Sequence, residues 1–337
     1  MASLEEARLR VARGLEAGEW DGFASRFLSM GWSAVASRGL ARPLVYAQGV
    51  RVVAVGGSTL GGSGKTPLAI ACARELAKGG AGRVVYVAHG YRAKPGSPRI
   101  VQVDDDLACV GDEALVAARA LEGSVAVVVA GTRQAALDYA SARADVIVVD
   151  GVLQTAPRRA SLALLALDAF SPWGTGYAPP RGDLRAPASD LLAAVDRAVL
   201  LRDELSTPAV PRLAGGRGVD IAEVVAHGAR FGDRRLAWPE LAAMRVGLFV
   251  ALARPSRIVA SLARRAVAPA VVIESSDHAP VSSWSLSRRL ASVPVDLWLA
   301  TAKCATHLEG ADIPHATLDH DVFLDESLVR ALRASTA

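Results

Sequence analysis

The sequence predicts an α/β protein: a doubly wound, mostly parallel sheet followed by a second, smaller α/β domain. Short apolar segments rich in Val, Ile and Leu recur along the chain and alternate with segments of helical periodicity. Continuous apolar strands of this kind are typical of a parallel sheet that is covered on both faces. The chain has 337 residues, which is enough for about two domains of ~150 residues each.

The first α/β pattern begins at residue 51. Buried strands are expected at 52–55, 84–88, 125–130, 146–149 and 162–167, and helices at 66–78, 112–121 and 132–142. A segment rich in Pro and Gly, 171–187, follows the last of these strands. We expect it to form a long ordered loop near the functional site.

A second α/β pattern begins near residue 208. It predicts strands at 246–252, 271–273 and 295–300, and helices at 255–265 and 283–291. We therefore divide the chain into an N-terminal helical segment (1–45), a core domain (46–205) and a smaller α/β domain with a C-terminal helix (206–337).

The N-terminal segment is expected to contain two helices, a charged one at 3–18 and a different one at 22–40. The second carries Phe23, Phe27 and Trp32 together with Arg26 and Arg38. An apolar face flanked by arginines is typical of a helix that lies in a membrane interface. It is equally typical of a helix packed on the protein's own core, and both interpretations stay open.

Composition narrows the class of protein. Hydrophobic residues make up 51% of the chain and charged residues 21%, as in a globular protein. The net charge of +4 suits a phosphate ligand or an anionic lipid surface, and the absence of a basic run predicts no nucleic-acid partner. Cys72, Cys109 and Cys304 have no metal-like spacing, which favours a reducing cytoplasm. The sequence has no uninterrupted apolar stretch of ~20 residues, so we expect no membrane-spanning helix.

Residues 57–67 carry the strongest chemical signal. They lie between a predicted strand and a predicted helix, the arrangement that holds the phosphates of a nucleotide. Lys65 would reach the β- and γ-phosphates of a bound nucleotide, and the Thr66 hydroxyl would bind Mg²⁺. Thr59 stands where the common pattern has its first glycine. The expected nucleotide-binding residues are Thr59, Gly61, Gly62, Ser63, Gly64, Lys65 and Thr66.

Acidic residues supply the other candidates. Asp150 directly follows the predicted strand 146–149 and is expected to support the metal ion. Asp112 opens a predicted helix, where a carboxylate is either a functional group or a helix cap. Asp277 and His278 follow a strand and would suit proton transfer, or form an ordinary loop pair. Residues 104–106 are interpreted as a solvated acidic turn.

Arginines near these segments could hold phosphates through the planar guanidinium group. Arg133 and Arg185 are the candidates, although most arginines in a chain this rich in Arg face solvent.

Together these residues resemble the tetraacyldisaccharide 4′-kinase family of lipid A biosynthesis. Residues 59–67 reproduce that family's phosphate loop, including the unusual Thr59. The resemblance spans roughly residues 40–305 through a series of short motifs. They are His89-Gly90-Tyr91, Val110-Gly111-Asp112-Glu113, Asp150 with Leu153-Gln154, residues 174–187, Ala253-Arg254-Pro255 and Asp277-His278.

The resemblance implies phosphoryl transfer from ATP, with Mg²⁺, to the 4′-hydroxyl of tetraacyldisaccharide 1-phosphate, giving lipid IVA. It implies a glycolipid substrate and the cytoplasmic face of the inner membrane, and we expect a monomer. Asp112 would be the general base, with His278 as its partner and Asp277 close behind. Arg133, Gln154 and Arg185 would contact the substrate.

This chain departs from the family's pattern at several carboxylates. The usual second acid after Asp150 is Gly151, and the histidine that follows is Thr155. The usual Leu-Arg-Glu-Pro has Ala186 in place of Glu, and Thr-Glu-Lys-Asp reads Thr301-Ala302-Lys303-Cys304. Two alternatives therefore stay open: a catalytically weakened paralogue that binds nucleotide or glycolipid, and a phosphate-loop kinase with another acceptor.

Overall fold

The computed structural model describes residues 2–40, 44–90, 93–153, 160–205, 218–275 and 283–335. The chain folds into two compact units. The smaller unit contains Met1–Arg13, Asp203–Ser206 and Val224–Asp321, and the larger contains Gly14–Arg202, Thr207–Glu223 and Val322–Ala337. The last helix therefore clusters with the larger unit. The expected domain boundaries at 45 and 205 stay a prediction.

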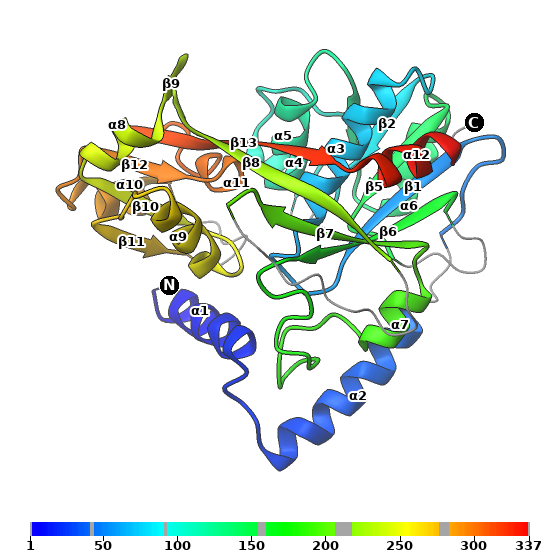
Figure 1. Cartoon of the computed structure of the whole chain (residues 1–337), viewed down its shortest axis with the longest axis horizontal. Helices are drawn as coiled ribbons and strands as arrows, with labels where there is room; N and C mark the ends of the chain where they lie inside the picture. The colour runs from blue at the N-terminus through cyan, green and yellow to red at the C-terminus, as the bar shows by residue number, and fades with distance from the viewer. Residues whose placement is uncertain are drawn as a thin grey trace. The chain divides into compact units, whose positions relative to one another are not determined.

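The larger unit is built on a mostly parallel sheet (Figure 1). Its strands are β1 (Arg51–Gly57), β2 (Val84–Val87), β3 (Arg99–Ile100), β4 (Ala126–Val129), β5 (Val146–Asp150), β6 (Leu162–Asp168) and β7 (Arg197–Asp203). They lie in the order β7-β6-β1-β5-β2-β4-β3, with the pairs between β7 and β4 parallel and β3 antiparallel to β4. The predicted α/β class and its buried strands are confirmed.

Helices cover both faces of this sheet. They are α3 (Lys65–Lys78), α4 (Leu107–Val110), α5 (Asp112–Ala120), α6 (Arg133–Ser141), α7 (Ala188–Ala193) and α12 (Glu326–Ala334). Leu137 of α6 packs with Val52 and Val85 in one apolar cluster. Leu191 of α7 packs with Leu165 in another. The residues of β1, β4, β5 and β6 are almost all buried, which is why they read as continuous hydrophobic runs.

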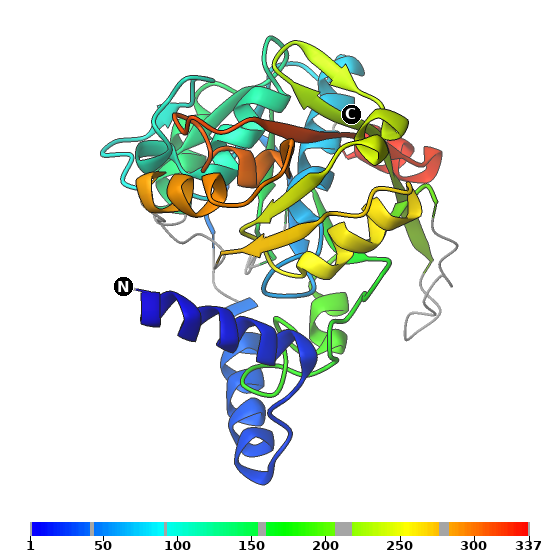
Figure 2. The same ribbon diagram turned by 90° about the vertical axis from the view of Figure 1, so that its left-hand side faces the viewer.

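The two N-terminal helices are α1 (Ala2–Ala17) and α2 (Phe23–Leu40). One side of α2 is fixed to the larger unit: the Ser29 hydroxyl donates to the Ala178 carbonyl at 2.6 Å, and the Ser37 hydroxyl donates to Asp190. Figures 1 and 2 both show α2 beside the loop of residues 171–187 and α7. No helix among the described residues is long and apolar enough to cross a bilayer.

The smaller unit has its own α/β pattern. It contains β9 (Arg234–Leu236), α8 (Trp238–Ala243), β10 (Val246–Val250), α9 (Pro255–Arg264), β11 (Val271–Glu274), α10 (Ser283–Ala291), β12 (Leu297–Ala300) and α11 (Ala302–Ala305). It also contains β8 (Val219–Phe231) from Val224 onward and β13 (His315–Leu324) up to Asp321, while the other ends of these two strands belong to the larger unit. Strand β10 lies between β11 and β12, parallel to both, while β8 and β9 form an antiparallel pair. The three predicted strands and two predicted helices are confirmed, and β8, β9 and β13 are additional.

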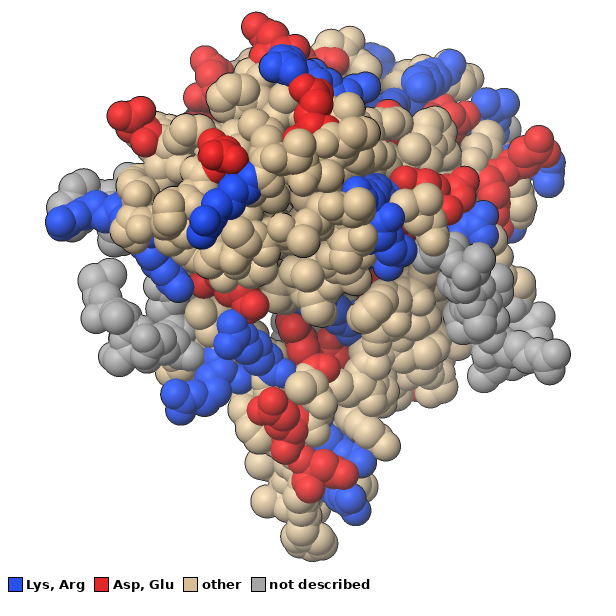
Figure 3. Space-filling view, turned by 60° about the vertical axis from the view of Figure 1, so that its left-hand side comes forward, with Lys and Arg blue, Asp and Glu red and all other residues tan. Residues whose placement is uncertain are grey.

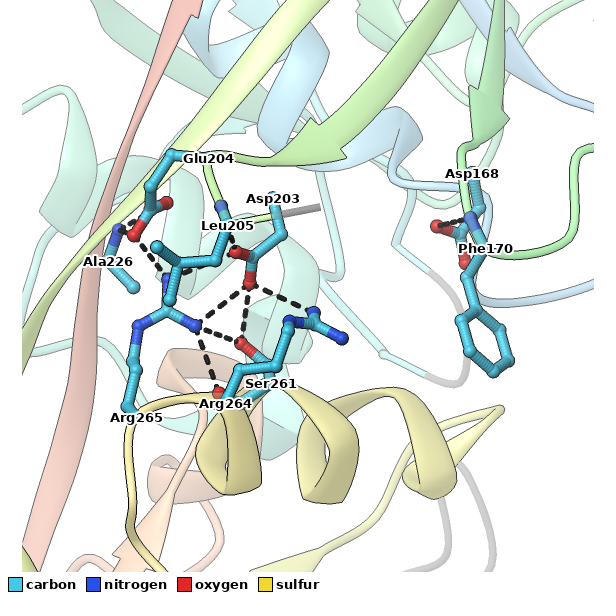
Figure 4. Close-up of polar contacts among 9 residues, drawn as sticks. All are labelled: Asp168, Phe170, Asp203, Glu204, Leu205, Ala226, Ser261, Arg264 and Arg265. Carbon is cyan, nitrogen blue, oxygen red and sulfur yellow. Dashed lines mark hydrogen bonds and ion pairs between the residues drawn. The ribbon is translucent and has the colours of Figure 1, made fainter. Parts of the chain in front are cut away.

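A buried ion network holds the segment that follows β7 in the smaller unit (Figure 4). The Arg265 side chain is only 3% exposed and donates to Asp203 at 3.0 Å and to Glu204. The Ser261 hydroxyl also donates to Asp203, at 2.7 Å. Burial raises the pKa of Asp203, but the hydrogen bonds from Arg265 and Ser261 outweigh it and lower the pKa to about 2.

Replacing Arg265 with Leu is expected to lower the free energy of unfolding by about 3 kcal/mol at neutral pH, because it leaves two partly buried carboxylates, Asp203 and Glu204, without their partner. Because the pKa of Asp203 falls from 3.8 to about 2 on folding, this carboxylate stabilises the fold above pH 3.8. The contribution is lost as the pH falls toward 2. Urea unfolding across this range measures the effect.

Arg264→Leu is the matched control, because Arg264 contacts the same carboxylate at 3.4 Å with a side chain that is 35% exposed. We expect it to cost less than about 1 kcal/mol. Equal losses in the two variants would contradict the importance of the buried network.

Candidate active site

The phosphate loop lies between the end of β1 and the start of α3. Gly64 precedes α3 with a φ of +79°, in the left-handed region, and a Cβ there would lie 2.8 Å from the Leu201 side chain. Both the backbone conformation and the space therefore require glycine at this position. The expected strand–turn–helix geometry of the loop is present, with its backbone at the N-terminus of a helix, where anions bind.

The loop of residues 171–187 holds the phosphate loop from one side. Arg185 N donates to the Ser58 carbonyl at 2.9 Å, and Leu60 N donates to the Asp183 carbonyl at 2.9 Å. Thr59 forms an antiparallel bridge with Leu184. The expectation that this segment is an ordered loop near the site is confirmed.

Thr59 is buried, and its hydroxyl donates to the Gly61 carbonyl at 2.6 Å. Its backbone does not adopt a positive φ. The position therefore does not need the conformational freedom of glycine, and the threonine hydroxyl bonds within the turn instead.

Asp150 ends β5 directly beside the strand that leads into the phosphate loop, because the parallel register pairs it with Val55. The Thr66 hydroxyl donates to Asp150 Oδ2 at 2.6 Å, and the Tyr86 hydroxyl donates to the same oxygen at 3.1 Å. Burial raises the pKa of Asp150, and the nearby positive charge of Lys65 opposes this shift.

Asp150 and Thr66 suit a magnesium ion. Asp150 Oδ1 is buried and has no hydrogen-bond partner among the described residues. The described part of the chain contains no cluster of three or more His, Cys, Asp or Glu side chains that would hold a metal by itself. Mg²⁺ in phosphate-loop sites needs only one or two protein oxygens, because phosphates and water complete its shell. The buried oxygen and the Thr66 hydroxyl supply that number.

Acidic residues at the start of α5 lie on the other side of Lys65. Lys65 Nζ contacts Glu113 Oε1 at 3.2 Å, and Glu113 N donates to Asp112 Oδ1 at 2.7 Å. Asp112 is buried. Glu113 is not among the site residues that the sequence predicts. The only sequence signal for it is its position after Asp112 at the start of a helix, and an acid at this position is equally typical of helix capping.

Arg133 and Arg185 both belong to this site. Burial lowers the pKa of each guanidinium, while Asp150 and Glu113 favour its charged form. Arg133 Nη2 and Arg185 Nε are buried without a hydrogen-bond partner among the described residues. Arg185 Nη2 reaches the Thr59 carbonyl at 3.5 Å.

Three of the expected site residues, Gln154, Asp277 and His278, lie outside the described residues. The acidic turn at 104–106 is structural, as expected: Asp105 pairs with Arg99, and Asp106 caps α4 by accepting from Ala108 N. Asp168, at the end of β6, accepts from Phe170 N at 3.2 Å (Figure 4).

A phosphate loop on the central strand of a parallel sheet, with an acid on the next strand, defines a P-loop nucleotide-binding protein. Comparison with known families shows which family within this class the chain belongs to. A profile of the tetraacyldisaccharide-1-P 4′-kinase family matches residues 28–336, and the chain belongs to that family.

Curated relatives agree with this assignment. The chain is 33% identical to a tetraacyldisaccharide 4′-kinase of Methylobacterium radiotolerans over 76% of this chain and 75% of the relative. It is 30% identical to the enzyme so named in Paramagnetospirillum magneticum, over 81% of each chain. A crystal structure described as an "apo" form of LpxK from Aquifex aeolicus in complex with ATP superposes with a TM-score of 0.67. That match has 20% identity, covers 92% of this chain and 98% of the other, and supports the fold.

Replacing Asp150 with Asn is expected to raise the free energy of unfolding of the nucleotide-free protein, because burial disfavours the charged carboxylate and raises its pKa. Asp145→Asn is the control with the opposite sign. Asp145 lies just before the same strand, and hydrogen bonds from Arg83 lower its pKa. Urea unfolding at neutral pH compares the two, and a loss of stability in Asp150→Asn would contradict the prediction.

Proposed function

We propose that this chain transfers the γ-phosphoryl group of ATP to the 4′-hydroxyl of a tetraacylated glucosamine disaccharide 1-phosphate, giving lipid IVA. The hydrogen bond between Thr66 and the buried Asp150 is the observation that carries the proposal, because it joins the phosphate loop to the acid of the neighbouring strand. The family match over residues 28–336 supports the acceptor. With this pairing intact and Lys65 beside it, a catalytically weakened paralogue is not favoured.

In the reaction, the bond between the γ-phosphorus and its bridging oxygen breaks as a new bond to the 4′-oxygen forms, and ADP leaves with the electron pair. Lys65 binds the phosphate oxygens. Asp112 receives the proton of the acceptor hydroxyl, and His278 and Asp277 support it. Asp112 suits this role because it is a buried carboxylate next to Glu113, which contacts Lys65. Most of the rate acceleration comes from positioning and charge stabilisation.

The Thr66 hydroxyl and Asp150 would hold Mg²⁺. When bound, this ion would neutralise part of the negative charge of the phosphates. Tyr86 keeps the Asp150 carboxylate oriented by donating to the oxygen that Thr66 also contacts.

Asp112→Asn is expected to lower kcat about 10²- to 10⁴-fold, the usual contribution of a general base. Lys65→Ala is expected to lower it by at least about 10²-fold, because it removes charge stabilisation of the phosphoryl group. Transfer of labelled phosphate from ATP to the purified disaccharide measures both. Asp105→Asn is the control, because Asp105 belongs to the acidic turn and pairs with Arg99. Full activity in both site variants would contradict the assignment.

We further propose that α2 docks on an anionic lipid surface at the cytoplasmic face of the inner membrane, and that the protein is a monomer. Phe23, Phe27 and Met30 are 91%, 70% and 71% exposed, while Phe23–Leu40 contains two arginines and no acid. Figure 3 shows mostly uncharged atoms at the bottom of the view, where α2 begins. Ser29 and Ser37 attach the helix to the loop of residues 171–187 and to α7, and its exposed apolar side chains suit the layer that holds the acyl chains.

Phe23→Asp with Phe27→Asp is expected to reduce binding to vesicles of anionic phospholipid about 100-fold, because two phenylalanines contribute about 3 kcal/mol of apolar burial. Flotation of the full chain measures this. The matched control is Phe231→Asp with Phe323→Asp, at positions 44% and 55% exposed outside α2. Equal flotation of both double variants would overturn the docking surface.

A further inference from the structure

The phosphate-loop site brings together charges of both signs. Lys65, Arg133 and Arg185 lie with the carboxylates Asp150, Glu113 and Asp112. Lys65 contacts Glu113 at 3.2 Å, whereas Asp150 takes its two hydrogen bonds from uncharged hydroxyl groups. What distinguishes the two arginines is the state of their buried donors.

Two donors of this cluster need an anion. Arg133 Nη2 and Arg185 Nε are buried, and neither has a hydrogen-bond partner among the described residues. A buried donor on a charged group is costly to leave unpaired. A phosphoryl group matches this need, because it carries several acceptor oxygens and a guanidinium binds them in a planar fork.

The backbone of Gly151 provides the space for Arg133. Its φ is +75°, and an added Cβ would lie 3.1 Å from Arg133 Nη2 and 3.6 Å from Lys65 Cε. A side chain at residue 151 would therefore crowd the guanidinium. A carboxylate there would also pair with it and neutralise its charge.

We infer that Gly151 opens the position beside Asp150 to the guanidinium of Arg133, which binds the phosphoryl group during transfer, with Arg185 next to it. This inference rests on the proposed kinase function and adds a residue to its site. Because residue 151 has no side chain, the positive guanidinium of Arg133 can approach the place where negative charge develops on the phosphoryl group during transfer.

The first test compares Gly151→Asp with Gly151→Asn. The two side chains have nearly the same shape, and both tolerate the left-handed conformation, so their difference isolates the charge. We expect kcat to be at least about tenfold lower for Gly151→Asp than for Gly151→Asn, since the carboxylate engages Arg133. A Gly151→Asp variant that is more active than the wild type would overturn the inference.

The second test needs no acceptor and does not depend on a variant at Gly151. Arg133→Gln is expected to weaken binding of Mg·ATP about tenfold and that of Mg·ADP less than about twofold, because only ATP carries the γ-phosphoryl group. Arg133→Lys should restore part of the difference by keeping the charge. Arg143→Gln, at an exposed position just after α6, is the control.

Equal losses of ATP and ADP affinity in Arg133→Gln would overturn the role of Arg133. Absence of acceptor phosphorylation by the wild-type protein would contradict the proposed function instead, while the ratio of ATP to ADP affinity would still report on Arg133. The two failures are therefore distinguishable.

Discussion

One buried carboxylate, Asp150, sets the geometry of the larger unit. A carboxylate removed from water destabilises a fold unless other groups hydrogen-bond to it. Here Tyr86 supplies one donor from β2 and Thr66 supplies another from α3, so the charge connects two strands and the helix that follows the phosphate loop. Two parallel registers make this possible: Val87 of β2 pairs with Val149 of β5, and Asp150 itself pairs with Val55 of β1, the strand that leads into the phosphate loop.

The loop of residues 171–187 links the two surfaces that the proposed function requires. On one side it pairs Leu184 with Thr59 of the phosphate loop, and on the other the Ala178 carbonyl accepts from Ser29 of α2. Its own Leu184 packs in an apolar cluster together with Leu153. The phosphate loop and the helix with the exposed apolar side are therefore held by the same packed segment.

Sequence patterns predicted β1, β2, β4, β5 and β6, and also β10, β11 and β12, because each is a short, continuous apolar run. The patterns missed β7, whose four central apolar residues lie between charged ones. They did not predict β8 and β13, whose apolar residues are interrupted by polar and charged ones, as Asp220 and Glu223 show in β8. The phosphate loop and Asp150 were predictable because they are local features of a strand end. The contact of Lys65 with Glu113 was not, since it joins residues 48 positions apart in sequence.

Two departures from the family's pattern, at residues 151 and 186, lie near arginines of the site. Ala186 stands where the resemblance implies Glu, and it is fully buried in the apolar cluster that contains Leu153. A glutamate at that place would bury a charge among apolar side chains unless it reached the neighbouring arginine. Glycine at 151 leaves the space beside Arg133 Nη2 without a side chain, and alanine at 186 directly follows Arg185 in the chain. Neither position carries a carboxylate that could pair with Arg133 Nη2 or Arg185 Nε, which are buried without hydrogen-bond partners among the described residues.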